Sequence, residues 1–547
     1  MSAYSEKPWL QNYGNVPHTL KEPLRPLYDV IERWGQDSRT AVVLEDREVS
    51  YSTLWSMVNR VARGLEQLGI HKGDRVAILL PNSLAFIQAY FGALRVGAVV
   101  VALNPLYTPA ELAALFMDSG PSVLIVPPEA AGKLPPGLPW PVMMADMHNR
   151  HEVEEEARLV YPQAHLFSDW LSLPEIENPP HIDPEKDLAL LQYTGGTTGL
   201  PKGAMLTHAN LWANAEQSRL WMQSLLSGGQ DTVLIALPLF HAYGMTVGMN
   251  LGLLIGARLV LMARFHPEQA ASWIVRTRPT LFPGAPTMYV ALAQYATEHN
   301  LDLTSIKGCI SGSAPLPESV QQNFERLTRG RIVEGYGLTE ASPVTHCQPV
   351  WPVDIRRTGI GLPYPSTEVR IIDSSGTDVP AGEPGELLVR GPQVMRGYWK
   401  RPEETKTALQ DGWLYTGDVA AMDPDGYFTI QDRKKDLIIC SGFNVYPREI
   451  EEVLYQYPGV EEACVIGIPD PYRGETVKAV IVPREGTALD AGKIEAFCKE
   501  RLVSYKRPRV YEMVDHLPKS AIGKILRREL IRAASQHGQE VSGKEQS

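Results

Sequence analysis

The residues most suited to chemistry lie in one stretch rich in glycine and threonine, Tyr193-Thr-Gly-Gly-Thr-Thr-Gly-Leu-Pro-Lys-Gly203. The glycines let the backbone approach a ligand closely, and the hydroxyl and ammonium groups can donate hydrogen bonds to phosphate oxygens. No Gly-Lys-Ser/Thr sequence follows at Walker A spacing. A flexible turn is the simpler alternative, but the density of threonine favours a phosphate-binding loop. Its candidate residues are Thr194, Gly195, Gly196, Thr197, Thr198, Gly199 and Lys202.

Further short motifs follow along the chain. They are Pro238-Leu-Phe-His-Ala-Tyr243, Gly312-Ser-Ala-Pro315, Glu334-Gly-Tyr-Gly-Leu-Thr-Glu340, Tyr415-Thr-Gly-Asp418, Asp432-Arg-Lys-Lys-Asp436, Ser441-Gly-Phe-Asn-Val-Tyr-Pro447 and Pro518-Lys-Ser-Ala-Ile-Gly-Lys524. In this order, the motifs resemble those of the adenylate-forming superfamily, which includes acyl-CoA synthetases, peptide-synthetase adenylation domains and firefly-type luciferases. The resemblance covers about residues 25 to 530. The motif at 441–447 and Gly391-Pro-Gln-Val-Met-Arg-Gly-Tyr-Trp399 most resemble bacterial long-chain fatty-acid–CoA ligases.

The resemblance implies a reaction in two steps. A carboxylate attacks the α-phosphorus of ATP, giving an acyl-adenylate and pyrophosphate, and the thiol of coenzyme A then displaces AMP. Thr194, Thr197, Thr198 and Lys202 would hold the departing phosphates. Glu340 would bind Mg²⁺ together with the Thr197 hydroxyl, because this ion prefers hard oxygen ligands. A surface carboxylate is the alternative for Glu340, and it is the commoner fate of glutamate.

The same resemblance implies a binding site for the nucleoside. Tyr336 stands between two glycines, so its ring face would be open to adenine, although a core tyrosine fits the same pattern. Asp418 could accept hydrogen bonds from the ribose hydroxyls, and Arg433 could reach the ribose or a phosphate. An ordinary turn aspartate and a solvated charge run are the alternatives. The other nucleotide-binding residues implied are Gly312, Ser313, Ala314, Glu334, Gly335, Gly337 and Thr339.

The resemblance implies roles in catalysis for two further residues, Lys524 and His241. Lys524 would bring a long cationic side chain to the α-phosphate and the carboxylate in the first step, although most lysines are simply solvated. His241 would orient the substrate and gate the thiol channel. A general base is not needed, because a carboxylic acid with a pKa of roughly 4 to 5, by analogy with glutamate, is already ionised at neutral pH. A packed core histidine is the alternative for His241.

The charged segment 433–436 is predicted to be a hinge, and the resemblance implies that the hinge residue is Lys435. Rotation there would withdraw Lys524 after the first step and open a path for coenzyme A. The residues brought to the site by this rotation would be Ser441, Gly442, Phe443 and Asn444. The chain would then divide into an N-terminal domain that binds AMP and the acyl group (1–432), the hinge, a C-terminal lid (437–535) and a disordered tail (536–547).

Short β-branched runs alternate with helical patterns in the first half of the chain, which predicts βαβ units on a mainly parallel sheet. After about residue 350, alternating runs punctuated by Gly and Pro predict a small β subdomain. The fold class is therefore α/β: a large N-terminal α/β domain of several subdomains, including the small β subdomain, plus a small mobile α+β C-terminal domain. Strands are expected at 75–80, 98–102, 123–126, 232–236, 258–261, 368–372 and 386–390, and a helix at 83–96.

Composition excludes several classes of protein. With 547 residues the chain is too long for one core, and its net charge of −11 disfavours a nucleic-acid binder. Five cysteines without a C-x-x-C pair exclude a disulfide scaffold and a ribbon-type zinc site, and they fit a reducing cytoplasm. The N-terminus lacks a signal-peptide pattern. The apolar stretch 246–263 is interrupted by Asn250 and Arg258, so it predicts a buried helix and strand and no membrane span. Peripheral membrane contact stays open.

The expected function is an ATP-dependent ligase that joins a medium- or long-chain fatty acid to coenzyme A in the cytoplasm, with ATP and Mg²⁺. The alternatives are an aryl-CoA ligase of the 4-coumarate type, a luciferase-like oxygenase, and a non-catalytic acyl or nucleotide binder. The presence of Lys524, Glu340 and Asp418 argues against the last. A peptide-synthetase module is disfavoured because only a short polar tail follows Lys524.

The acyl substrate is the least determined feature. Small residues could leave room for a long acyl tunnel, or they could reflect close helix packing. The residues concerned are Gly244, Gly248, Gly252, Gly312 and Ser313. A homodimer is expected from the resemblance alone.

Overall fold

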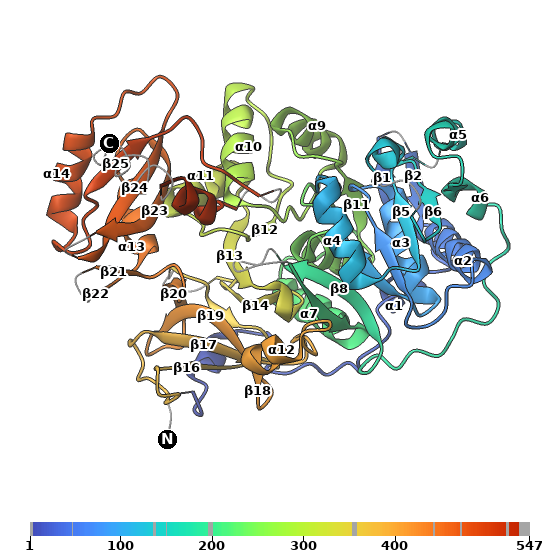
Figure 1. Cartoon of the computed structure of the whole chain (residues 1–547), viewed down its shortest axis with the longest axis horizontal. Coiled ribbons are helices and arrows are strands. Elements are labelled where there is room, and N and C mark those ends of the chain that lie inside the picture. Colours follow the sequence, from blue (N-terminus) through green and yellow to red (C-terminus); the bar gives the residue numbers. More distant parts are fainter. Residues whose placement is uncertain are drawn as a thin grey trace, which may run out of the picture. The chain divides into compact units, whose positions relative to one another are not determined.

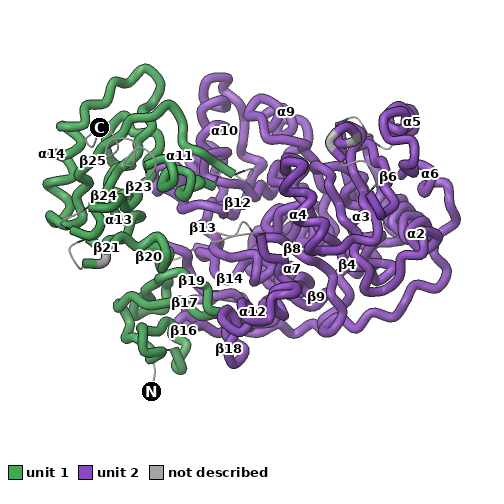
Figure 2. The backbone as a smooth tube through the Cα atoms, viewed as in Figure 1, with its two compact units in different colours: residues 1–8, 370–388, 415–547 green, residues 9–369, 389–414 purple. Residues whose placement is uncertain are grey.

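The computed structural model describes residues 4–45, 47–134, 138–148, 150–194, 201–352, 358–440, 443–470, 473–520 and 524–534. The chain forms two compact units, which Figure 2 shows in different colours. The smaller unit comprises Met1–Pro8, Arg370–Leu388 and Tyr415–Ser547, and the larger unit comprises Trp9–Val369 and Val389–Leu414. The domain division expected at residue 432, the hinge and the lid motion stay predictions.

The main sheet of the larger unit has seven strands in the order β7-β6-β5-β3-β4-β8-β9. All neighbours are parallel except β8 and β9, which are antiparallel. The mainly parallel sheet is therefore confirmed. Its strands are β3 (Arg75–Ile78), β4 (Val99–Ala102), β5 (Val123–Val126), β6 (Val142–Met144), β7 (His165–Leu166), β8 (Leu188–Thr194) and β9 (Lys202–Thr207).

The first βαβ unit shows why the sequence folds this way locally. Helix α3 (Leu84–Arg95) begins after Ser83, whose Oγ accepts a hydrogen bond from the Phe86 N–H over 3.1 Å. Such a cap satisfies a donor that the first helical turn would otherwise leave unpaired. The helix is apolar on nearly every side and is buried over Leu84–Leu94, which suits a helix enclosed within the core. The helix and strands predicted here are confirmed to within a few residues.

Two further sheets lie wholly within the larger unit. One has the order β10-β11-β1-β2 and the other β12-β13-β14-β15. Their strands are β1 (Thr40–Leu44), β2 (Arg47–Ser50), β10 (Thr232–Ile235), β11 (Arg258–Leu261), β12 (Gly308–Ser311), β13 (Arg331–Gly337), β14 (Val344–Cys347) and β15 (Leu362–Pro363). The α-helices of this unit are α1 (Asp29–Glu32), α2 (Tyr51–Gln67), α3, α4 (Pro109–Ser119), α5 (His151–Val160), α6 (Phe167–Trp170), α7 (His208–Met222), α8 (Leu251–Leu254), α9 (Pro267–Thr277), α10 (Pro286–Glu298), α11 (Glu318–Thr328) and α12 (Pro402–Ala408).

The β subdomain expected after residue 350 is a five-stranded sheet. Its order is β16-β17-β19-β18, and β20 pairs with β19. The strands are β16 (Glu368–Ile372), β17 (Gly385–Arg390), β18 (Leu409–Gln410), β19 (Trp413–Met422) and β20 (Phe428–Arg433). This sheet confirms the prediction of short strands at 368–372 and 386–390.

The C-terminal part of the smaller unit has a second five-stranded sheet, β22-β21-β24-β23 with β25 on β24. Alternate residues of its strands enter two separate cores, as a pleated sheet with both faces covered requires. Figure 1 shows α13 and α14 beside these strands, and their residues Ile450 and Ile494 lie in one of the cores. The elements are β21 (Ile438–Cys440), β22 (Phe443–Val445), α13 (Pro447–Tyr455), β23 (Val460–Asp470), β24 (Gly474–Pro483), α14 (Ala491–Arg501) and β25 (Val510–Met513).

The apolar stretch 246–263 forms a π-helix (Gly244–Asn250), the short helix α8 and then strand β11, all largely buried. The prediction of a buried helix and strand is therefore confirmed. Among the residues that the structure describes, no helix is long and apolar enough to cross a membrane. The five cysteines are buried and free, which agrees with the absence of a disulfide scaffold.

Candidate functional site

The predicted phosphate loop joins two strands of the main sheet. Thr194 ends β8 and Lys202 begins β9, and the two residues pair directly across the antiparallel ladder. The main sheet therefore holds both ends of the loop together. Gly195, Gly196, Thr197, Thr198 and Gly199 lie outside the described residues, and their contacts to phosphate stay a prediction.

Lys202 and Glu340 both contact the same side chain, that of Tyr398. The Lys202 ammonium lies 5.2 Å from the centre of the Tyr398 ring, within the range of a cation–π contact. The Tyr398 hydroxyl donates a hydrogen bond to Glu340 Oε1 over 2.7 Å. Burial and the Glu340 carboxylate raise the pKa of Tyr398, which keeps its hydroxyl protonated as a donor. Tyr398 therefore positions the predicted metal ligand beside the predicted phosphate-binding lysine.

Backbone pairing brings Tyr398 to this place. The Met205 N–H donates to the Gly397 carbonyl over 2.9 Å, and the Trp399 N–H donates to the Gly203 carbonyl over 2.8 Å. The segment 396–399 thus continues the sheet beyond β9. The Met395 N–H also donates to the Glu340 carbonyl over 2.8 Å, so the backbone of Glu340 is held by the same segment. Tyr398 lies in the Gly391–Trp399 motif, but the sequence does not mark it as a site residue, because it is far from the signature loop in the chain.

Tyr336 lies near the end of β13, where it pairs with His346 of β14. The two rings meet edge to face with centroids 5.9 Å apart. Burial lowers the pKa of His346 to about 3, so its imidazole is neutral at physiological pH. The Tyr336 side chain is partly exposed. It thus has packing on one side and accessible surface on another, as a stacking platform requires.

The glycine that follows Tyr336 allows a close approach of two strands. A Cβ atom at Gly337 would lie 2.0 Å from the Pro343 carbonyl oxygen, so a larger residue would push the strands apart. Glu334 has a structural contact, because its Oε2 accepts a hydrogen bond from the Leu316 N–H over 3.1 Å. This bond ties β13 to the segment that follows Gly312, Ser313 and Ala314.

His241 is held by its own turn. Its N–H donates to the Pro238 carbonyl, and its Nδ1 accepts a hydrogen bond from the Tyr243 N–H, each over 3.2 Å. An Nδ1 that accepts leaves the ring proton of the neutral imidazole on Nε2. This geometry fixes the ring orientation, which suits an orienting role; the role itself stays a prediction.

The small residues considered for an acyl tunnel pack closely at three positions. Added Cβ atoms would lie 2.4 Å from the Pro238 carbonyl oxygen at Gly244, 2.4 Å from Leu259 at Gly252 and 2.9 Å from the Tyr243 ring at Gly312. At Gly248 the nearest atoms, of Ile235, are 3.6 Å away. Close packing therefore explains Gly244, Gly252 and Gly312, and these positions do not by themselves indicate a long tunnel.

In the smaller unit, Asp418 and Arg433 form an ion pair. They pair across β19 and β20, and Arg433 Nε lies 3.3 Å from Asp418 Oδ1. Asp418 is 6% exposed. The preceding Gly417 has φ +71°, a left-handed conformation that favours glycine, and its carbonyl accepts a hydrogen bond from the Lys434 N–H over 2.9 Å.

Lys524 belongs to the same cluster of charges. Burial, together with the positive charges of Arg433 and Lys435, lowers the pKa of Lys524 to about 8, whereas Asp418 and Asp436 oppose the shift. The Lys524 backbone is fixed on both sides, because its N–H donates to Ser520 Oγ over 3.2 Å and its carbonyl accepts from the Ser520 N–H over 2.8 Å. The structure therefore brings together Lys524, Asp418, Arg433 and Lys435, which the sequence separates.

The residues predicted to reach the site after rotation are only partly described. Ser441 and Gly442 lie outside the described residues, and of Asn444 only its place in β22 is described. Phe443 is 53% exposed and stacks on Tyr505, with ring centroids 4.5 Å apart. Their approach to coenzyme A stays a prediction.

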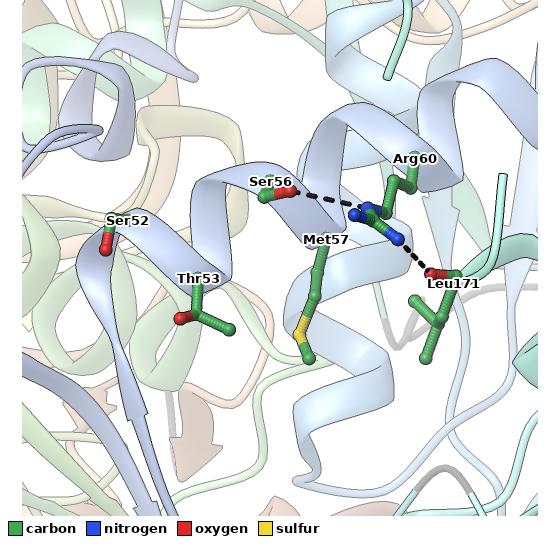
Figure 3. A pocket seen from close by; sticks show the side chains of 6 residues that line it. All are labelled: Ser52, Thr53, Ser56, Met57, Arg60 and Leu171. Atoms are coloured by element: carbon green, nitrogen blue, oxygen red, sulfur yellow. Dashed lines mark hydrogen bonds between the residues drawn. The ribbon is translucent and has the colours of Figure 1, made fainter. Parts of the chain in front are cut away.

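A pocket of about 400 Å³ lies elsewhere in the larger unit, beside α2 (Figure 3). Arg60 is the charged residue among those that line this pocket, and its guanidinium already donates to the Leu171 carbonyl over 2.7 Å and to Ser56 Oγ over 3.3 Å. The pocket contains no predicted site residue, and it carries no functional assignment. Its lining residues are Ser52, Thr53, Ser56, Met57, Arg60 and Leu171.

Comparison with known families decides the class of protein. The model of the AMP-binding enzymes matches residues 31–399, and the model of the AMP-binding enzyme C-terminal domain matches residues 449–524. The chain belongs to the AMP-binding enzyme family. The resemblance inferred from its motifs is thereby confirmed.

Individual relatives narrow the class further. A long-chain-fatty-acid–CoA ligase of Bacillus subtilis is 41% identical, over 96% of this chain and 98% of the relative. A feruloyl-CoA synthase of an Amycolatopsis species is 40% identical, over 90% of this chain and 95% of the relative. These relatives place the chain among the adenylate-forming acyl-CoA ligases of the family.

Solved structures confirm the fold. The anthranilate CoA ligase AuaEII, in complex with anthranoyl-AMP, has a TM-score of 0.85 at 30% identity, over 95% of this chain and 99% of that one. ATP-bound MatB from Rhodopseudomonas palustris has a TM-score of 0.81 at 29% identity, over 93% of this chain and 98% of that one. The α/β class with a large N-terminal and a small C-terminal domain is therefore confirmed.

Proposed function

We propose that this protein converts a medium- or long-chain fatty acid to its coenzyme A thioester through an acyl-adenylate. The observation that carries the proposal is the grouping of Lys524 with Asp418 and Arg433 around one partly buried position. Such a group offers a cation for developing phosphate charge and a carboxylate for ribose hydroxyls. The Bacillus subtilis relative supports the choice of a fatty acid.

In the first step, an oxygen of the substrate carboxylate attacks the α-phosphorus, and the bond from this phosphorus to the pyrophosphate leaving group breaks. Lys524 stabilises the negative charge on the α-phosphoryl oxygens as the new bond forms. Lys202 binds the departing phosphates, while Asp418 accepts hydrogen bonds from the ribose hydroxyls. Tyr336 stacks on adenine. No residue has to remove a proton from the acid, because the carboxylate is already ionised.

In the second step, the thiol of coenzyme A loses its proton to solvent, its sulfur attacks the acyl carbonyl carbon, and the bond from this carbon to the phosphate oxygen of AMP breaks, so that AMP leaves. His241, with its ring held by the Tyr243 N–H, orients the acyl group for this attack. Lys524 is not needed once the adenylate exists. The two half-reactions therefore depend on different residues.

A Mg²⁺ ion fits the residues around Glu340. Mg²⁺ is commonly bound by one or two carboxylates together with substrate phosphates and waters. Glu340 supplies such a carboxylate, with one oxygen oriented by the Tyr398 hydroxyl, close to the phosphate-binding Lys202. When bound, the ion would neutralise phosphate charge during the first step. Thr197 is the second ligand expected from the sequence.

An aryl-CoA ligase is the second candidate. One observation favours it: the feruloyl-CoA synthase relative. The acid specificity therefore has to be tested directly.

The test measures pyrophosphate release with ATP, Mg²⁺ and coenzyme A. The acids compared are fatty acids from C4 to C18 and, as alternative substrates, benzoate and 4-coumarate. The expected result is release that depends on a medium- or long-chain fatty acid and that Lys524→Ala abolishes. Preference for benzoate or 4-coumarate would overturn the fatty-acid assignment and support the aryl-CoA ligase. Lys524→Ala should still convert supplied acyl-adenylate and coenzyme A to thioester, and equal loss of both half-reactions would contradict the mechanism.

A further inference from the structure

Arg527 connects three carboxylates of the smaller unit. It lies three positions after Lys524, at the start of a helical segment, 527–534. Its Nη1 lies 3.2 Å from Asp436 Oδ2 and 3.7 Å from Asp432 Oδ1, and its Nη2 donates to Glu451 Oε1 over 2.5 Å. All four side chains are at most 20% exposed. Breaking an ion pair that is shielded from water in this way costs more free energy than breaking a surface pair.

The partners of Arg527 lie on different sides of the predicted hinge. Asp436 and Glu451 follow Lys435 in the chain, so they would turn together with Arg527. Asp432 precedes Lys435 and would stay behind. Rotation at Lys435 would therefore break the pair between Arg527 and Asp432 and would leave the pairs with Asp436 and Glu451 intact.

A second contact at Asp432 crosses the hinge in the same way. Asp432 Oδ2 accepts a hydrogen bond from the Arg448 N–H over 3.0 Å, at the start of α13. Asp432 Oδ1 accepts from the N–H of the adjacent Arg433 over 2.7 Å. Asp432 is only 4% exposed, and burial raises its pKa while Arg527 opposes this shift. A buried carboxylate in this position depends on Arg527 to remain charged at low cost.

Arg527 is also coupled closely to Lys524. The intervening Ile525 forms a backbone bridge with Lys519 and packs, with Leu530 and Ile531, against the core cluster that contains Ile466 and Val480. The short stretch from Lys524 to Arg527 thus has little freedom. Holding Arg527 on Asp432 therefore also restrains the backbone at Lys524.

We propose that Arg527 is a positioning residue for the first half-reaction: its ion pair with Asp432 holds Lys524 in place, and rotation at Lys435 releases that pair. The inference rests on the proposed function, because it needs two half-reactions that use Lys524 differently. Arg527 itself touches no reacting atom. Its pairs with Asp436 and Glu451 persist in both arrangements and keep the guanidinium ready to pair with Asp432 again.

The test compares Asp432→Asn with Glu451→Gln. Each removes one negative charge from a partner of Arg527, but only Asp432 lies before the hinge. Glu451→Gln keeps an oxygen for the Val465 N–H, whereas Asp432→Asn keeps an oxygen for only one of the Arg433 and Arg448 N–H groups. The first half-reaction is followed by exchange of labelled pyrophosphate into ATP with dodecanoate. The second is followed by thioester formation from supplied dodecanoyl-adenylate and coenzyme A. Melting temperatures of all variants are recorded alongside.

Asp432→Asn is expected to slow the first half-reaction about tenfold and to leave the second unchanged or faster, since it weakens one shielded ion pair. Glu451→Gln is expected to lower the melting temperature but to leave the ratio of the two rates within about twofold of the wild type, because its pair does not cross the hinge. Equal loss of both half-reactions in Asp432→Asn, or the same change of ratio in both variants, would overturn the proposal.

Arg527→Lys is a second variant that does not depend on Asp432→Asn folding. Lysine keeps the positive charge but lacks the planar fork that reaches several carboxylates at once. The rate of the first half-reaction is again expected to fall relative to that of the second, by less than in Asp432→Asn. An unchanged ratio of the two rates would overturn the proposal. If the wild-type protein catalyses neither half-reaction with any acid of the C4–C18 and aromatic panel, the proposed function fails, and that outcome is distinct from an unchanged ratio in an active enzyme.

Discussion

Tyr398 donates a hydrogen bond to Glu340 across 58 positions of the chain, with 2.7 Å between the hydroxyl oxygen and Oε1. The same tyrosine ring lies 5.2 Å from the Lys202 ammonium. A predicted metal ligand and a predicted phosphate-binding lysine are thus both oriented by one aromatic side chain. Partners of this kind, one step removed from the ligand, commonly affect metal affinity as strongly as some of the ligands do.

Tyr398→Phe is expected to raise the Mg²⁺ concentration for half-maximal pyrophosphate release by about tenfold, because the variant loses the hydroxyl that orients Glu340. The phenylalanine ring keeps the contact with Lys202, so the affinity for ATP should change less. Titration of the activity with Mg²⁺ measures the effect. Tyr51→Phe is the matched control, since the Tyr51 hydroxyl donates over 2.6 Å to the Ala257 carbonyl, away from the predicted site residues. An equal response of the two variants would contradict the role of Tyr398.

The first half-reaction is expected to depend on the protonation of Lys524. Burial, with Arg433 and Lys435, lowers the pKa of Lys524 to about 8 in the protein without ATP, while Asp418 and Asp436 oppose the shift. The side chain is charged below this pH and becomes neutral above it, so kcat/KM for ATP in adenylate formation should fall as the pH rises through about 8. Bound ATP favours the charged form, which should move the corresponding fall in kcat to higher pH.

Lys524→Arg distinguishes this lysine from other titrating groups. Arginine stays charged across the whole range, so the variant should lose the alkaline fall in kcat/KM, even if its rate is lower because the geometry differs. Rates between pH 6 and 10 with a constant-ionic-strength buffer provide the comparison. An alkaline fall that persists unchanged in Lys524→Arg would assign it to a different group.

Lys435→Pro is expected to spare adenylate formation and to slow thioester formation by at least about tenfold, because a fixed φ opposes rotation at the predicted hinge. Lys435→Ala is the control, since it removes the charge but leaves the backbone free to rotate. The two half-reactions are measured separately for both variants. A normal overall rate in Lys435→Pro would count against the hinge assignment.

Gly337→Ala is expected to destabilise the protein by about 1–3 kcal/mol and to weaken ATP binding, because the added Cβ would lie 2.0 Å from the Pro343 carbonyl oxygen and would displace the adjacent Tyr336. Thermal unfolding and equilibrium binding of ATP measure the two effects. Gly248→Ala serves as the control, since its Cβ would meet only ordinary contacts at 3.6 Å. Wild-type stability and affinity in Gly337→Ala would show that the strand can move at little cost.

Much of the fold was predictable because local patterns decide local structure. The strands at 75–80 and 98–102 and the helix between them follow from β-branched runs that alternate with a helical pattern, and β3, α3 and β4 match them closely. The family was predictable for a different reason. Its motifs are short, ordered and close to the chemistry, so Glu340, Tyr336, Asp418 and Lys524 could each be named with an implied role.

Only the tertiary structure decided which of these residues lie close together, and which other side chains connect them. Tyr398 reaches Glu340 because segment 396–399 pairs with β9, and no local pattern specifies such a pairing. Arg527 joins Asp432, Asp436 and Glu451 because the helical segment 527–534 packs against the sheet that precedes it. The glycines that might have marked a tunnel proved to be close-packed at three positions, a matter of distances between distant segments. Sequence patterns predict the type of chemistry and the local helices and strands. Contacts between remote segments depend instead on how the whole chain buries its apolar surface.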